Sequence, residues 1–317
     1  ASADGGQRWS HKSIGLPQGS AVNALAFDTS GKKLYAATEN GIYVTSTRGQ
    51  SWSAVPGLPT DAFTALAFDS SSPQTIFAGT QHHGALISHD AGATWSPMNT
   101  NLPATAINGL TYDSNTQQLW AATNEGVYRT GESGASWQAF NSGLPANTIA
   151  FDIVPADISG GTAGLVLAGT NQGFYLSQNN GSLWAPSKSA LLHLAIYAVL
   201  IDAQNASTFY LATDKIGALR SLDGGQSWGS IAGGLPRGQP VYALAQGATN
   251  NGQLFAASND IYLFPGNASS FNLSQLLPVL LALVLFYLLY RLSTRGRKRG
   301  RKEQPERIVE QEDEKTM

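Results

Sequence analysis

Cysteine is absent from the 317-residue sequence, which excludes disulfide bonds and thiolate metal sites. Charged side chains are scarce, at 13% of the residues, and acidic ones prevail over most of the chain. Residues 1–290 hold 10 Lys and Arg against 15 Asp and Glu, a net charge of −5. Because phosphate binding needs a basic surface, this acidic body argues against nucleic acid as a partner. A helical hydrophobic period is also lacking before residue 271.

What the sequence has instead is a repeat that ends in tryptophan. Six related octets, such as SHDAGATW over Ser88–Trp95, end at Trp9, Trp52, Trp95, Trp137, Trp184 and Trp228. These tryptophans are 43, 43, 42, 47 and 44 residues apart. A period of this length is typical of repeat architectures, in which each unit is one supersecondary element.

Each repeat contains four short segments with the composition of β-strands. In the first complete repeat they are Val22–Asp28, Lys33–Thr38, Gly41–Thr45 and Trp52–Val55. These segments are rich in β-branched and aromatic residues and are bounded by Gly, Asn, Asp or Pro. Four strands within 42–47 residues predict one blade of a β-propeller, so we expect an all-β fold.

The two ends of the repeat region complement each other and predict a closed ring of six four-stranded blades over residues 1–265. The sixth repeat stops after its third strand, Asp260–Phe264, and the missing fourth strand is present at the other end as Trp9–Ile14. Pairing these two segments would close the ring and remove an exposed strand edge.

The octet resembles the Asp-box, or BNR, repeat, which occurs in propellers of sialidases, of the sortilin luminal domain and of the photosystem II assembly-factor type. Its pattern is Ser/Thr-x-Asp-x-Gly-x-Thr/Ser-Trp, and Ser88–Trp95 matches it fully, whereas Thr47, Glu132 and Asn179 replace the aspartate elsewhere. In such a turn Asp bonds nearby backbone N–H groups, Gly permits a positive φ, and Trp packs between blades. We therefore expect a structural role for the residues of this pattern, which are Ser2, Asp4, Gly6, Trp9, Gly49, Trp52, Ser88, Asp90, Gly92, Thr94, Trp95, Gly134, Trp137, Gly181, Trp184, Ser221, Asp223, Gly225 and Trp228.

Resemblance to sialidases would imply an arginine triad that grips a carboxylate, a Tyr/Glu nucleophile pair, an acid and an Arg-Ile-Pro motif. The sequence has no such motif, and Arg8, Arg48, Arg129, Arg220 and Arg237, the arginines of the repeat region, lie outside the innermost strands. The starts of those strands also lack the facing carboxylates that other glycosidases need. We therefore predict that the chain is not an enzyme and binds no cofactor or metal. The alternatives are a sialidase-like glycoside hydrolase and a passive structural surface protein.

The last part of the chain has the composition of a membrane anchor. After a linker over residues 266–272, a helix over residues 273–292 would be long enough to span a bilayer, and Leu276–Tyr290 contains no charged residue. Seven basic residues follow between Arg291 and Lys302, and such flanks remain in the cytoplasm. We expect a single-pass membrane protein with the propeller outside the cytoplasm and a disordered, basic then acidic cytoplasmic tail over residues 293–317.

A partner site is predicted on one face of the ring. Turns between the second and third strands share a face with the links between blades, including Asp61, and the short linker should hold the other face toward the membrane. The free face is where we expect a protein or carbohydrate ligand, since binding residues commonly lie on loops of a rigid scaffold. The adjacent histidines of this face rarely supply convergent metal ligands, so we interpret them as polar turn residues. The candidate residues are Glu39, Asn40, His82, His83, Glu125, Asp214, Lys215 and Asp260.

Overall fold

The computed structural model describes residues 10, 12–131, 134–156, 164–187, 191–231, 238–247, 253–258 and 261–264. Several predicted features lie outside these residues, namely Ser2, Asp4, Gly6, Trp9, Asp260, the membrane span over residues 273–292 and the tail over residues 293–317. Among the described residues, no helix is long and apolar enough to cross a membrane.

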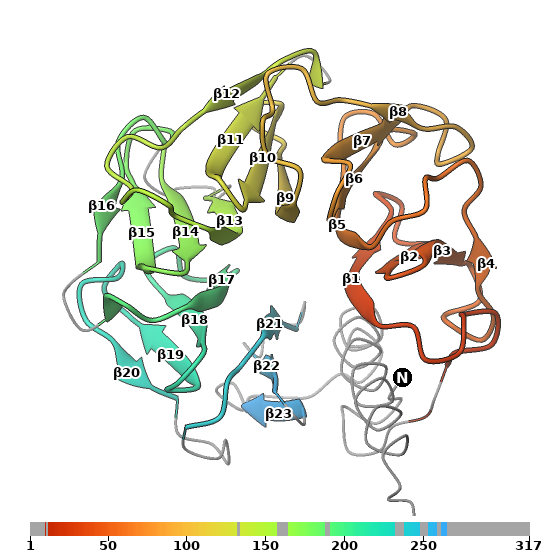
Figure 1. Cartoon of the computed structure of the whole chain (residues 1–317). Coiled ribbons are helices and arrows are strands. Elements are labelled where there is room, and N and C mark those ends of the chain that lie inside the picture. The colour runs from red at the N-terminus through yellow and green to blue at the C-terminus, as the bar shows by residue number, and fades with distance from the viewer. Residues whose placement is uncertain are drawn as a thin grey trace, which may run out of the picture.

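The described chain forms six antiparallel sheets that stand as blades around a central axis (Figure 1). Consecutive strands of a blade run from the axis outward. Blade 1 consists of β1 (Val22–Phe27), β2 (Leu34–Thr38), β3 (Gly41–Thr45) and β4 (Ser53–Ala54). Blade 2 consists of β5 (Phe63–Phe68), β6 (Ile76–Thr80), β7 (Ala85–Ser88) and β8 (Ser96–Pro97). Blade 3 consists of β9 (Ile107–Asp113), β10 (Gln118–Thr123), β11 (Gly126–Thr130) and β12 (Trp137–Ala139).

Blades 4 to 6 repeat this order and confirm the predicted all-β, six-bladed propeller. Blade 4 consists of β13 (Ala150–Pro155), β14 (Val166–Thr170), β15 (Gly173–Ser177) and β16 (Ala185–Pro186). Blade 5 consists of β17 (Ile196–Ile201), β18 (Phe209–Thr213), β19 (Ala218–Ser221) and β20 (Gly229–Ser230). Blade 6 consists of β21 (Ala243–Gln246), β22 (Leu254–Ala257) and β23 (Ile261–Phe264).

The closure of the ring falls partly on residues that the structure does not describe. Trp9 and Asp260 are among them, so the pairing of the terminal strands stays a prediction. Lys12 and Ile14 nevertheless occupy the place of a link between blades, because the indole and backbone N–H groups of Trp52 each donate to one of their carbonyl oxygens at 2.8 Å.

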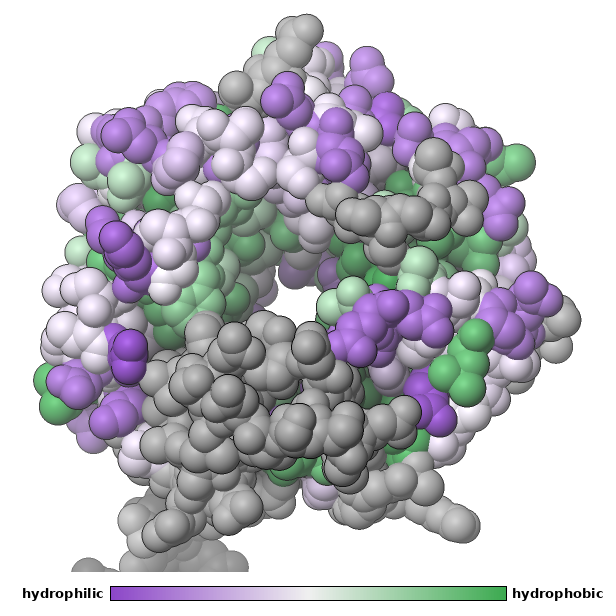
Figure 2. All heavy atoms as spheres, turned by 180° about the vertical axis from the view of Figure 1, so that it is seen from behind, coloured by the Kyte–Doolittle hydropathy of each residue, from purple (hydrophilic) through white to green (hydrophobic). Residues whose placement is uncertain are grey.

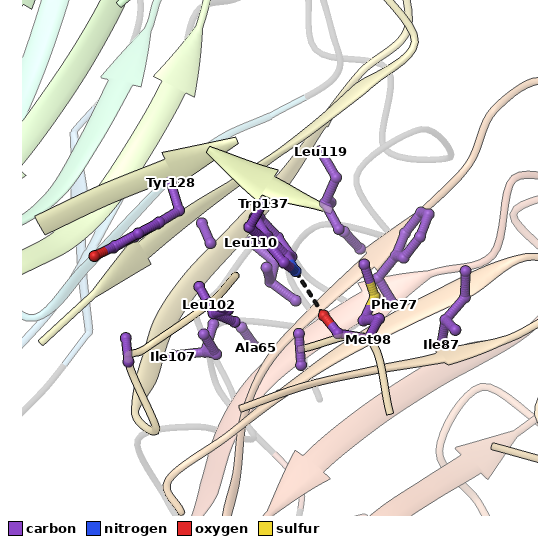
Figure 3. Packing of buried hydrophobic residues seen from close by; sticks show 14 residues of the cluster. Ala65, Phe77, Ile87, Met98, Leu102, Ile107, Leu110, Leu119, Tyr128 and Trp137 are labelled. Atoms are coloured by element: carbon purple, nitrogen blue, oxygen red, sulfur yellow. Dashed lines mark hydrogen bonds between the residues drawn. The ribbon is translucent and has the colours of Figure 1, made fainter. Parts of the chain in front are cut away.

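The hydrophobic core is divided among the spaces between neighbouring blades. All five residues of β2, β6, β14 and β18 are buried, because the second strand of a blade is covered on both faces. Figure 3 shows one such space, where Trp137 of β12 packs near Leu119 of β10 and Phe77 of the preceding blade. The indole N–H of Trp137 also donates to the carbonyl of Met98 at 2.6 Å and so joins the two blades.

The first strands of all six blades line the axis. They contact one another in chain order, β1 with β5, β5 with β9, and so on to β21. The ring therefore places six equivalent strand positions, one from each repeat, around a single channel. Figure 2 shows that channel as an opening at the centre of the space-filling view.

Candidate functional site

The turns between the second and third strands gather on one face of the ring, which we call the upper face. Of the predicted partner-binding residues, Glu39, Asn40, His82, His83, Glu125 and Lys215 are exposed on these turns, and Asp214 is half-buried beside them. At the end of the second strand in blades 1 to 5 a buried threonine hydroxyl donates across the turn to a backbone carbonyl, as from Thr38 to Gly41 and from Thr213 to Gly217. The turns are thus anchored to the sheet at their base.

The turns of blades 2 and 5 are longer than those of blades 1, 3 and 4, and these two blades lie opposite each other. In blades 1, 3 and 4 two residues separate the second strand from the third. In blade 2 four residues do so, Gln81–Gly84, and in blade 5 again four, Asp214–Gly217. Because blades 2 and 5 are three positions apart in a ring of six, the longer turns face each other across the channel.

A buried carboxylate holds the blade 2 turn. The Asp61 side chain is 1% exposed and accepts from Nδ1 of His82 at 2.9 Å and from Nδ1 of His83 at 2.7 Å. It also accepts from the backbone N–H groups of His82, His83 and Ala62 at 2.9, 3.1 and 2.8 Å. Burial alone would raise the pKa of Asp61, but these hydrogen bonds outweigh it and hold that pKa well below its usual value. The carboxylate is therefore ionised and fully bonded.

A ring of bulge residues surrounds the mouth of the channel just below the turns. The second residue of β1, β5, β9, β13 and β17 has no partner of its own on the neighbouring strand, which marks a β-bulge in each blade. Bulges re-aim a side chain and are frequent next to binding sites. These five residues are half-buried, and so is Tyr242, which stands at the equivalent place before β21.

The bulge ring has a polar half in blades 1 to 3. Here Asn23 donates to the carbonyl of Phe63 at 2.8 Å, Asn108 donates to Ala150 at 2.7 Å, and the hydroxyl of Thr64 donates to Ile107. Each bond joins a bulge to the first strand of the next blade. We call Asn23, Thr64 and Asn108 the polar arc.

The other half, in blades 4 to 6, is aromatic. The ring of Phe151 lies 5.3 Å from that of Tyr197, and Tyr197 lies 5.5 Å from Tyr242, both between ring centroids. Burial and the charge of nearby Asp214 raise the pKa of Tyr197, so its phenol is neutral at ordinary pH. We call Phe151, Tyr197 and Tyr242 the aromatic arc; its two tyrosines each carry a phenol hydroxyl group.

Two carboxyl groups lie within the innermost strands, since Asp113 is the last residue of β9 and Asp152 is the third residue of β13. Asp152 follows Phe151, at a position that is Ala24, Ala65, Ala198 or Gly109 in other blades. Its oxygens accept from the backbone N–H groups of Ile153 and Val199, each at 2.9 Å. Burial raises the pKa of Asp152 despite these bonds. Asp152 was not among the predicted site residues, because only the first residues of the innermost strands were considered and it is the third residue of β13.

The tryptophan octets form turns on the opposite, lower face. The side chain and backbone of Thr94 and the hydroxyl of Ser88 donate to Asp90 and lower its pKa to about 2. The hydrogen bonds from Ser227 and Ser221 do the same for Asp223. The carboxylate oxygens of both aspartates therefore accept hydrogen bonds within their own turns, on the face opposite the channel mouth of the upper face.

The described residues contain no group of three or more His, Asp or Glu side chains placed to hold a metal ion. The predicted site residues lie on the turns and do not include the bulge ring beneath them. Alignment of the six repeats would have shown the signal, since the second position of the first strand reads Asn, Thr, Asn, Phe, Tyr, Tyr.

Comparison with known proteins gives relatives for the propeller. Residues 1–118 match the model of the DUF6242 beta propeller domain. A xyloglucanase from Hypocrea jecorina is 29% identical over 252 residues, which cover 74% of this chain and 28% of that protein. The chain thus spans less than a third of this relative. None of this tests the resemblance to Asp-box propellers of sialidases, which stays a prediction.

Solved structures share the fold at lower identity. The GH74 xyloglucanase from Xanthomonas campestris superposes with a TM-score of 0.64 at 16% identity, over 84% of this chain and 48% of that one. The GH74 enzyme from Niastella koreensis gives 0.62 at 17% identity, over 77% of this chain and 42% of that one. The similarity to the xyloglucanase sequence points to a glycoside hydrolase and overturns the prediction that this chain is not an enzyme.

Proposed function

We propose that the propeller recognises a neutral polysaccharide of the xyloglucan type at the mouth of its channel on the upper face. The observation that carries this proposal is the aromatic arc Phe151, Tyr197 and Tyr242, whose rings follow one another over three blades. The C–H faces of sugar rings are apolar and stack on aromatic rings, while their hydroxyl groups need a few placed hydrogen-bonding partners. The polar turns around the arc offer such partners, and the xyloglucanase relative supports the choice of polysaccharide.

The test is binding of tamarind-type xyloglucan by the purified full chain, followed by isothermal calorimetry or affinity electrophoresis. Tyr197→Ala should weaken binding at least about tenfold, because it removes the middle ring of the arc. Tyr43→Ala is the matched control, since Tyr43 is a half-buried tyrosine of β3, away from the channel. Equal losses from both variants, or no binding by the wild type, would refute polysaccharide recognition at this site.

A second candidate function is hydrolysis of the same polysaccharide, favoured by the xyloglucanase relative. Two carboxyl groups adjoin the aromatic arc: Asp152, whose raised pKa suits a proton donor, and Asp214, whose charge acts on Tyr197. The full chain should then release reducing ends from xyloglucan, and Asp152→Asn or Asp214→Asn should abolish the release while binding remains. Binding without any release, under conditions where a known xyloglucanase works, would reject hydrolysis and leave recognition standing.

The composition of residues 273–302 supports a further proposal, that the chain displays this propeller outside a cell from a single membrane span. A polysaccharide is too large to cross a membrane, so a propeller that binds it would have to lie outside the cell.

A further inference from the structure

We propose that His82 and His83, held by Asp61, form a second glycan subsite across the channel from the aromatic arc, so that the polysaccharide spans the mouth from blade 5 to blade 2. This inference rests on the proposed polysaccharide recognition and specifies how the same face would do it. The four-residue turns of blades 2 and 5 lie on opposite sides of the channel mouth.

The hydrogen bonds of the blade 2 turn fix the chemistry of its two imidazoles. Asp61 is ionised and can only accept, so Nδ1 of each histidine carries the proton that it donates at 2.9 and 2.7 Å. In the neutral rings, Nε2 therefore keeps a free lone pair. The two side chains are 69% and 53% exposed, whereas the carboxylate that orients them is 1% exposed. The turn thus presents two acceptors of fixed orientation, suited to sugar hydroxyl donors.

The turn is held so firmly that little ordering remains to be done on binding. The hydroxyl of Thr80 accepts from the backbone N–H of His83 at 2.9 Å, and the side chain of Asn99 donates to the His83 carbonyl at 2.8 Å. Asn99 also accepts from Ala85 at 2.9 Å, at the start of the next strand. Preorganised groups of this kind bind with a smaller loss of conformational entropy.

The blade 5 turn, across the channel from the histidines, exposes an apolar side chain. Ile216 in the blade 5 turn is 44% exposed, a large apolar side chain in water, and Tyr197 lies at the base of the same blade. One side of the mouth therefore offers apolar surface for stacking, and the other offers acceptors for hydroxyl groups. A chain of several sugars that lies across the channel would use both sides, whereas a short oligosaccharide would reach only one.

The charge of the face favours a neutral ligand. Glu39 and Glu125 are exposed on the turns of blades 1 and 3, and Asp214 lies at the blade 5 turn, where the ammonium of Lys215 is 3.6 Å from its carboxylate. An acidic rim repels uronic acids, since like charges across an interface oppose binding. Neutral xyloglucan should therefore bind and polygalacturonate should not.

The experiment measures binding of the full chain to polymeric xyloglucan and to its short oligosaccharides by calorimetry. The double variant His82→Ala/His83→Ala keeps the Asp61 bonds to the backbone, so it should fold, yet bind the polymer about tenfold more weakly, as expected for two lost net hydrogen bonds. Its affinity for short oligosaccharides, held by the aromatic arc, should not change. His89→Ala, an exposed histidine next to Asp90 on the lower face, is the matched control and should bind as the wild type does.

Asp61→Asn tests the positioning role separately. Both imidazoles remain, but an amide can no longer accept both Nδ1 protons, so polymer binding should fall and the imidazole ¹⁵N signals should depart from the Nδ1–H form. If the double variant binds the polymer like the wild type while Tyr197→Ala loses it, the second subsite is refuted and polysaccharide recognition stands. If the wild type binds no xyloglucan, both proposals fail together.

Discussion

Replacement of Asp61 by alanine should destabilise the propeller more than any other single change on the upper face. The carboxylate is 1% exposed, and its loss leaves the backbone N–H groups of Ala62, His82 and His83 without their acceptor. A buried donor left unpaired costs about 1–3 kcal/mol, but the exposed histidine turn admits water to part of this site. We therefore expect a loss of about 2–4 kcal/mol in the free energy of unfolding, or roughly 5–15 °C in the Tm of a domain of this size.

The assay is thermal unfolding of the full chain followed by circular dichroism, with Glu39→Ala as control. Glu39 is an exposed carboxylate on the equivalent turn of blade 1, and its replacement should change stability by less than about 0.5 kcal/mol. A Tm for Asp61→Ala within a degree of the wild type would show that the carboxylate does not hold the turn.

The pH dependence of the same site gives an independent check. The pKa of Asp61 is lower in the folded protein than in the unfolded chain, so its contribution is fully present above the ordinary carboxyl value and is lost as the pH falls below it. The Tm difference between the wild type and Asp61→Asn should therefore be constant near neutral pH and shrink below about pH 4. A difference that grows with acid would contradict the ionised, hydrogen-bonded state of Asp61.

The remaining predictions concern the core, the inner strand and the membrane. Trp137→Phe should cost about 1–3 kcal/mol, because it breaks the 2.6 Å bond to Met98 between blades; Trp95→Phe, whose indole bonds its own turn at Gly92, should cost less, and equal losses would count against the bridging role. Because the pKa of Asp152 is raised on folding, the wild type should lose stability relative to Asp152→Asn as the pH rises above about 4; a wild-type Tm that rises relative to that of the variant over this range would reject this. Protease added to intact cells that express the full chain should remove the propeller and spare an epitope placed after Met317, whereas protection of the propeller would reverse the orientation proposed.

The sequence by itself determined the architecture, because the signals for it are local. A strand such as Leu34–Thr38 is specified by its own β-branched and aromatic residues, and a turn such as Ser88–Trp95 is closed by bonds between residues at most four apart. The period of the tryptophans then gave the number of blades. The prediction that the chain is not an enzyme was wrong for a different reason, since it rested on the sialidase motif and on the residues at the very starts of the innermost strands.

The tertiary structure alone decided which side chains meet. A bulge adds one residue to a strand and changes the direction of its side chain, so period-two alternation could not assign Phe151, Tyr197 and Tyr242 to the channel mouth. The sequence likewise marked His82 and His83 as turn residues, but their shared carboxylate lies 21 and 22 residues earlier. The pairing of β5 with β6 brings Asp61 to the histidine turn within blade 2, and the packing of neighbouring blades brings the three aromatic rings together.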